Sequence, residues 1–117
     1  MGRRKFYRHT LPLGLPVMDC ETSLFIGVIR NISLNGFHMQ GTSDDMEEGK
    51  RLRVHITGDK QYGGSIECEF EVPVRCVWIH EAKDEYRAGF EYVELSEETL
   101  VALRKLIEQI HPGETQI

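Results

Sequence analysis

The side chains best suited to binding a ligand are cations near the start of the chain. The stretch "RRKFYRH" contains Arg3, Arg4, Lys5 and Arg8, and no Asp or Glu occurs among the first 18 residues. Planar arginine side chains bind phosphates and carboxylates through paired hydrogen bonds. A solvated basic tail would be the simplest interpretation of such a run. However, two aromatic residues within it are costly to leave exposed, so we interpret it as a tethered anion-binding segment.

The rest of the chain has the opposite charge. The 117 residues carry a net charge of −5, and the first 18 carry +4, which leaves −9 for the other 99. An acidic body repels extended polyanions such as duplex DNA, whose affinity depends largely on phosphate neutralisation. The charge distribution therefore favours a compact phosphorylated ligand over a nucleic acid.

A second group of polar residues lies at 31–36, in the stretch "NISLNG". Asn31 and Ser33 are able to bind a ligand, but such residues also satisfy backbone groups at strand ends. The dipeptide Asn35-Gly36 is a common hairpin turn. The first three residues are formally a glycosylation sequon, which a cytoplasmic chain would not present to the glycosylation machinery. Alone, this stretch leaves the binding and structural interpretations open.

The elements that hold these two motifs are mostly strands. Apolar and polar residues alternate over 66–78, which predicts one face against a core and one toward solvent, with Trp78 as a core or semi-exposed residue. Pro73 falls on the polar side and indicates an edge, a bulge or a bend. Further strand-like stretches are 13–20, 24–32, 52–56 and 86–92. Many short strands with hairpin spacing predict a small antiparallel β-barrel.

One helix follows the strands. Ser96 is a suitable N-cap, and the next two residues are acidic, as the positive end of a helix dipole favours. An apolar stripe that we expect to pack against the barrel comprises Leu100, Leu103, Leu106, Ile107 and Ile110. We expect a single domain made of a basic segment (1–12), a barrel (13–94) and a helix (95–111).

Together, the two motifs resemble the signature of the PilZ family, R-x-x-x-R followed by [D/N]-x-S-x-x-G. Arg4 and Arg8 match the first motif, and Asn31, Ser33 and Gly36 match the second. The stretch "YRAGFEYVELSEETLVALRKLI" is similar to the final strand and closing helix of that family. The resemblance covers nearly the whole chain and implies a single-domain member. It implies a mainly β fold, a six-stranded antiparallel barrel with a C-terminal helix, that acts as a bacterial receptor for the second messenger cyclic di-GMP.

The resemblance also implies roles for the motif residues. Arg4 and Arg8 would bind a guanine edge and phosphate oxygens, and Asn31 and Ser33 would hydrogen-bond a guanine. Gly36 would allow a close backbone approach. In this family, an arginine at the position of Arg3 goes with binding of an intercalated pair of ligands instead of one. No cofactor is implied besides the ligand, and the expected output is control of motility or biofilm formation through an unidentified downstream protein.

Nothing in the sequence predicts catalysis or metal binding. The five histidines are scattered without metal-ligand spacing, and Ser33 does not lie in a nucleophile elbow. We therefore expect a protein that is not an enzyme. The absence of a long apolar run and of a secretory signal predicts a cytoplasmic location without membrane insertion, where the three cysteines stay reduced.

Two other functions remain as alternatives to the receptor. The first is a PilZ-like adaptor that acts through protein contacts and binds no nucleotide. The second is a small barrel that binds nucleic acid with its basic arm, which conflicts with the acidic body.

Overall fold

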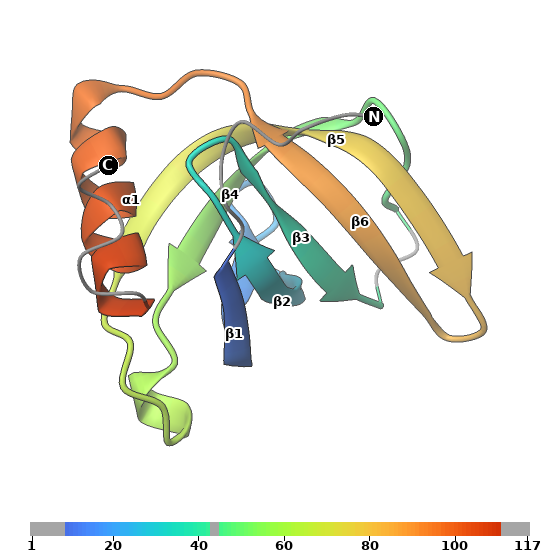
Figure 1. Ribbon diagram of the computed structural model, residues 1–117. Coiled ribbons are helices and arrows are strands. Elements are labelled where there is room, and N and C mark those ends of the chain that lie inside the picture. Colours follow the sequence, from blue (N-terminus) through green and yellow to red (C-terminus); the bar gives the residue numbers. More distant parts are fainter. Residues whose placement is uncertain (1–8, 43–44, 111–117) are drawn as a thin grey trace, which may run out of the picture.

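The chain folds into a closed barrel of six antiparallel strands with one α-helix at its side (Figure 1). The computed structural model describes residues 9–42 and 45–110. The strands are β1 (His9–Asp19), β2 (Phe25–Ile32), β3 (Gly36–Gly41), β4 (Arg51–Thr57), β5 (Glu69–Ala82) and β6 (Glu85–Tyr92). Their order around the barrel is β1-β2-β3-β6-β5-β4. The predicted six-stranded antiparallel barrel is thus confirmed.

Alternation of side chains along each strand separates the core from the surface. In β5, Phe70, Val72 and Val74 are buried, whereas Glu69 and Glu71 are exposed. Successive side chains of a strand point to opposite faces, so the apolar set fills the barrel interior. The largest fully buried side chains are Phe37, Leu15, Ile29, Ile32, Met39, Ile56, Leu103, Leu106, Val17, Val54 and Val72.

This alternation is broken at Val77. Cys76 lies opposite Phe90, but Trp78 lies opposite Gly89, so β5 has one extra residue at this point. An extra residue of this kind turns all following side chains to the other face. The regular alternation therefore does not extend to Trp78, which lies on the outer face and, at 38% exposed, is the semi-exposed residue of the two predicted possibilities. The irregularity suggested by Pro73 occurs four residues further along.

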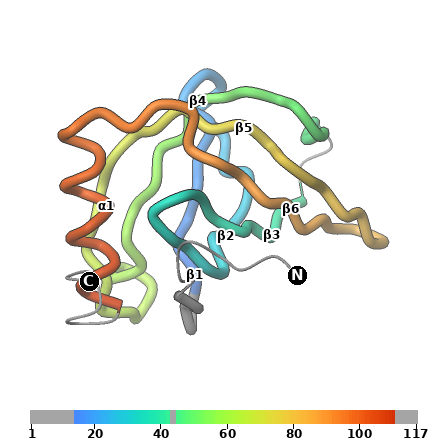
Figure 2. Tube along the Cα trace, turned by 45° about the horizontal axis from the view of Figure 1, so that its top comes forward, coloured from blue at the N-terminus to red at the C-terminus, as the bar shows by residue number. Residues whose placement is uncertain are grey.

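The helix α1 (Glu97–Ile110) packs against β5 and β1 (Figures 1 and 2). The hydroxyl of Ser96 accepts a hydrogen bond from the Thr99 backbone N–H at 3.1 Å, which confirms the predicted N-cap. The apolar stripe faces the barrel, with Leu103, Leu106 and Ile107 buried. Among the helices of the described residues, none has both the length and the apolar character needed to cross a membrane.

The far end of α1 is attached to the segment before β5 by a reciprocal pair of hydrogen bonds. The Gln109 Oε1 accepts from the Glu67 N–H at 2.8 Å, and the Gln109 Nε2 donates to the Glu67 carbonyl oxygen at 2.7 Å. The Gln109 side-chain amide thus pairs with the Glu67 backbone through the same two hydrogen bonds that a residue of a neighbouring strand would form. The helix is thereby held at both its capped start and its end.

Candidate ligand-binding site

The outer face of the barrel is hollowed across four neighbouring strands, β2, β3, β6 and β5. This hollow has a volume of about 360 Å³, and its polar and aromatic lining consists of Arg30, Asn31, His38, Gln40, Trp78 and Arg87. Pockets that bind small molecules have volumes of roughly 300–1,000 Å³. No residue that lines the hollow is acidic, although the chain outside the basic segment is strongly acidic. The hollow therefore suits an anionic ligand with aromatic groups.

Trp78 forms an aromatic wall of the hollow. Its indole lies over Gly89, where a Cβ would collide with the indole Nε1. The His38 ring meets the indole edge-on, with ring centroids 5.2 Å apart and an angle of 77° between the planes. Because Gly89 has no side chain, the indole packs on the backbone of β6 and still exposes part of its surface.

Two strand irregularities direct side chains into the hollow. One is the bulge at Val77, which turns Trp78 outward. The other is in β2 at Arg30, where Ile29 pairs with Met39 but Asn31 pairs with His38. Bulges near binding sites commonly redirect side chains in this way. Without the extra residue in β5, Trp78 would point to the opposite face of the sheet, away from the hollow.

The bulge in β5 is supported by Cys76. Its thiol donates a hydrogen bond to the Trp78 carbonyl oxygen, with 3.4 Å between Sγ and oxygen. Burial, together with the charge of Glu48, raises the pKa of the Cys76 thiol, so the proton needed for this donation is retained. The three cysteines are free thiols, as the sequence predicted.

Two residues of the second motif have different positions. Asn31 lines the hollow, whereas Ser33 stabilises the loop beside it through hydrogen bonds. Ser33 is 1% exposed. Its Oγ accepts hydrogen bonds from the backbone N–H groups of Asn35 and Gly36, at 3.2 and 3.3 Å. The hydroxyl also lies 3.3 Å from the Gly36 carbonyl oxygen, to which it donates. The predicted contact of Ser33 with a ligand stays a prediction.

Gly36 is required by a close contact between strands. A Cβ at this position would collide with the Phe90 carbonyl oxygen of β6. The same loop is held by Tyr92, whose hydroxyl donates to the Ser33 carbonyl oxygen at 3.1 Å and whose N–H donates to the Asn35 carbonyl oxygen at 3.2 Å. Since β2 ends at Ile32 and β3 begins at Gly36, the loop between them has three residues and is not the two-residue Asn35-Gly36 hairpin.

Arg3, Arg4 and Arg8 lie outside the described residues. The strand that continues from them begins at His9, which pairs with Ile32 in β2, and the next residue pairs with Asn31. A residue spans at most about 3.6 Å of chain. The basic segment therefore joins the barrel directly beside a residue of the hollow.

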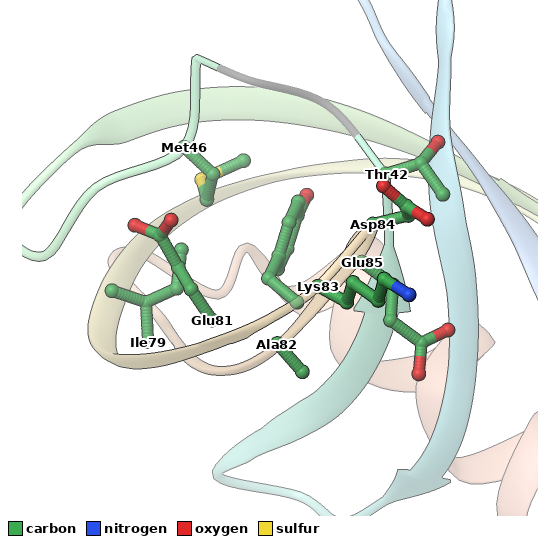
Figure 3. Close-up of a pocket in the computed structure, with 9 residues that line it drawn as sticks. Thr42, Met46, Ile79, Glu81, Ala82, Lys83, Asp84 and Glu85 are labelled. Atoms are coloured by element: carbon green, nitrogen blue, oxygen red, sulfur yellow. The ribbon is translucent and has the colours of Figure 1, made fainter.

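A second cavity has the opposite electrostatic character. It measures about 210 Å³ and lies at the turn between β5 and β6. Glu81, Asp84 and Glu85 are among its lining residues, and their carboxylates surround the same turn in Figure 3. An acidic lining opposes an anionic ligand, so this cavity is not the candidate site. No cluster of His, Cys, Asp or Glu able to hold a metal ion occurs within 9–42 and 45–110.

The sequence patterns missed most of the lining. Arg30, His38, Trp78 and Arg87 belong to no motif and come from four different strands. One signal was present, since a glycine inside a strand such as Gly89 often marks a place where another group approaches the backbone. The pattern does not identify that group.

Comparison with known proteins places the fold. The family model described as "PilZ domain" matches residues 2–109. The PilZ domain of YcgR from Escherichia coli, solved with c-di-GMP, superimposes with a TM-score of 0.72 at 16% identity, over 93% of this chain and 92% of that one. The Bacillus subtilis inhibitor of motility, MotI/DgrA, matches with a TM-score of 0.69 at 18% identity over 93% of this chain.

A longer YcgR structure from Escherichia coli, in complex with c-di-GMP, gives a TM-score of 0.69 at 17% identity and also covers 93% of this chain. The chain spans 52% of the MotI/DgrA chain and 46% of this YcgR chain. No curated protein matches.

Proposed function

Because the chain belongs to the PilZ domain family, we propose that it is a receptor for cyclic di-GMP that binds its ligand at the hollow over β2, β3, β6 and β5. The observation that carries this proposal is the hollow itself: arginine, asparagine and aromatic side chains meet there without a carboxylate, next to the point where the basic segment joins β1. Two solved structures of Escherichia coli YcgR with c-di-GMP share the fold.

The chemistry of the ligand matches this lining. Cyclic di-GMP carries two phosphodiester charges and two guanines. The O6 and N7 atoms of a guanine accept two hydrogen bonds from one arginine, and purines stack on aromatic rings. Arg4 and Arg8 would bind a guanine edge and phosphate oxygens from above, while Asn31 would hydrogen-bond a guanine from the barrel surface. Trp78 would support a base.

Binding would change the surface that a partner meets. The ligand's charges would neutralise the repulsion among Arg3, Arg4, Lys5 and Arg8 and hold the basic segment against the acidic barrel. A downstream protein would then recognise the segment together with the ligand. In this proposal the domain acts by binding and not by catalysis.

Calorimetric titration with cyclic di-GMP tests the proposal, with GTP and cyclic GMP as controls. We expect binding of cyclic di-GMP alone, and its loss in Arg4→Ala and Arg8→Ala. A ratio near two ligands per chain would support the role of Arg3 in binding a pair, and a ratio near one would remove that role. If the wild-type protein bound no cyclic di-GMP, the receptor would be rejected in favour of the adaptor.

A further inference from the structure

We propose that Arg87 is an additional ligand contact of the hollow, and that Gln40 is a positioning residue that keeps Arg87 available for it. This inference rests on the proposed function, because it concerns the same site. Neither residue belongs to the two sequence motifs. The argument depends on how charges are paired over the outer face of the barrel.

Three basic side chains outside the hollow are neutralised by an acidic neighbour. Arg53 pairs with Glu71 at 3.1 Å, and Lys60 pairs with Glu67 at 2.9 Å. The Arg75 Nε donates to the Glu91 Oε2 at 2.8 Å. The two arginine pairs join adjacent strands, and the lysine pair lies within the connection between β4 and β5. Such pairing is the ordinary arrangement on a protein whose acids outnumber its cations.

Arg87 differs from these cations. It is exposed, and among the residues that the structure describes no carboxylate forms an ion pair with it. Its neighbours across the two adjoining strands are Gln40 and His80, neither of which is an acid. Arg87 therefore contributes a positive charge to the hollow that no carboxylate within residues 9–42 and 45–110 pairs with.

The two nearest acids on the same face of β6 are both engaged elsewhere. Side chains of a strand share a face at every second residue, which places Glu85, Arg87 and Glu91 in one row. The Glu85 Oε1 accepts a hydrogen bond from the Gln40 Nε2 at 2.8 Å, and Glu91 is held by Arg75. Gln40 thus binds the carboxylate that stands two residues from Arg87.

The position of Gln40 allows it to keep the Glu85 carboxylate away from Arg87. Gln40 is the direct cross-strand neighbour of Arg87, yet its amide donates diagonally to Glu85, which lines the acidic cavity. The bond marks the boundary between the acidic cavity and the hollow. With Glu85 occupied, the Arg87 guanidinium is left to bind a phosphate or guanine edge of the ligand.

Titration of four variants with cyclic di-GMP tests this inference. We expect Arg87→Gln to weaken binding about tenfold or more, since a hydrogen bond to a charged group contributes about 1.5–3 kcal/mol and 1.4 kcal/mol is a factor of ten. Arg53→Gln is the matched control, because it removes the same charge from the same face outside the hollow. It should change the affinity less than about twofold.

The role of Gln40 requires a different comparison. In Gln40→Met, Glu85 is free to pair with Arg87, so binding should weaken severalfold, and Glu85→Gln added to that variant should restore it. The affinity of Arg87→Gln should also depend less steeply on ionic strength than that of the wild type. Thermal unfolding serves as the folding control and should be nearly unchanged in Arg87→Gln.

The outcomes separate this inference from the receptor proposal. If the wild type binds and Arg87→Gln binds equally well, the Arg87 contact is rejected and the receptor stands. If Glu85→Gln fails to rescue Gln40→Met, the positioning role of Gln40 is rejected. If the wild type binds no cyclic di-GMP, the receptor is rejected and this inference is rejected with it.

Discussion

The indole of Trp78 lies over Gly89, its neighbour across β5 and β6, at a position where no larger residue would fit. The bulge at Val77 creates this relationship, because it turns Trp78 away from the core and toward the outer face. Gly89 then provides a flat backbone surface for the ring. Trp78, which the alternation of apolar residues would place on the core side of β5, therefore forms an aromatic wall of the candidate site.

Trp78 is the single tryptophan of the chain, so its fluorescence should report ligand binding directly. We expect cyclic di-GMP to change the emission of the wild type in a saturable manner, because a base would contact the indole. Trp78→Leu should weaken binding about tenfold, since stacking of a base on an aromatic side chain contributes about 1–3 kcal/mol. Calorimetry measures the second effect.

An exposed aromatic residue outside the hollow controls for that substitution. Tyr62 is 65% exposed and lies in the short 3-10 helix η1 (Lys60–Tyr62), between β4 and β5, so Tyr62→Leu should leave the affinity unchanged. Equal affinity of Trp78→Leu and the wild type would show that the indole does not contact the ligand.

Gly36→Ala should destabilise the barrel by about 2–4 kcal/mol, as overpacking against an immovable backbone group does. The added Cβ would collide with the Phe90 carbonyl oxygen, and β3 would have to move away from β6. Urea denaturation measures the loss. Gly49→Ala is the control, since a Cβ there meets no atom within 4 Å.

Gly49 has a φ of 91°, so its substitution should still cost about 1–2 kcal/mol through backbone strain. A Gly36→Ala loss no larger than the Gly49→Ala loss would contradict the steric account of Gly36.

Gln109→Leu should lower the free energy of unfolding by about 1–2 kcal/mol, because two hydrogen bonds to the Glu67 backbone are lost at an exposed site. The affinity for cyclic di-GMP should not change, since neither residue lines the hollow. Gln61→Leu, at an exposed position of the 3-10 helix, is the control for stability. Equal stability of the two variants would show that the attachment of α1 does not depend on this amide.

Tyr86 should make the protein less stable at alkaline pH. Burial, and secondarily the nearby Cys76, raises the pKa of the Tyr86 hydroxyl to about 12, whereas an unfolded tyrosine titrates near its usual value of about 10. The folded state therefore keeps the proton longer than the unfolded state does. The contribution of the protonated Tyr86 to the free energy of unfolding is therefore fully present below pH 10 and is lost as the pH rises from 10 to 12.

Denaturation of the wild type and Tyr86→Phe across this pH range measures the effect. The stability of Tyr86→Phe should fall less steeply than that of the wild type, although the variant loses the hydrogen bond to the Ile26 carbonyl oxygen. Tyr62→Phe should follow the wild type. Parallel curves for Tyr86→Phe and the wild type would contradict the prediction.

Local patterns in the sequence were sufficient to predict the class of fold. Period-two alternation in β4, β5 and β6 predicts strands that bury one face, and Ser96 with its apolar stripe predicts a capped helix on a core. These properties depend on neighbours a few residues apart, which the sequence displays directly. The two motifs and their order also identified the family that the family model matches.

Only the tertiary structure decided which side chains share the site. The pairing of Asn31 with His38, of His38 with Gly89, and of Gly89 with Trp78 joins four strands across the barrel. Register and bulges determine these pairs, and both depend on contacts between residues distant in the chain. One extra residue at Val77 reversed the orientation of Trp78, and a period-two pattern in the sequence does not predict such a bulge.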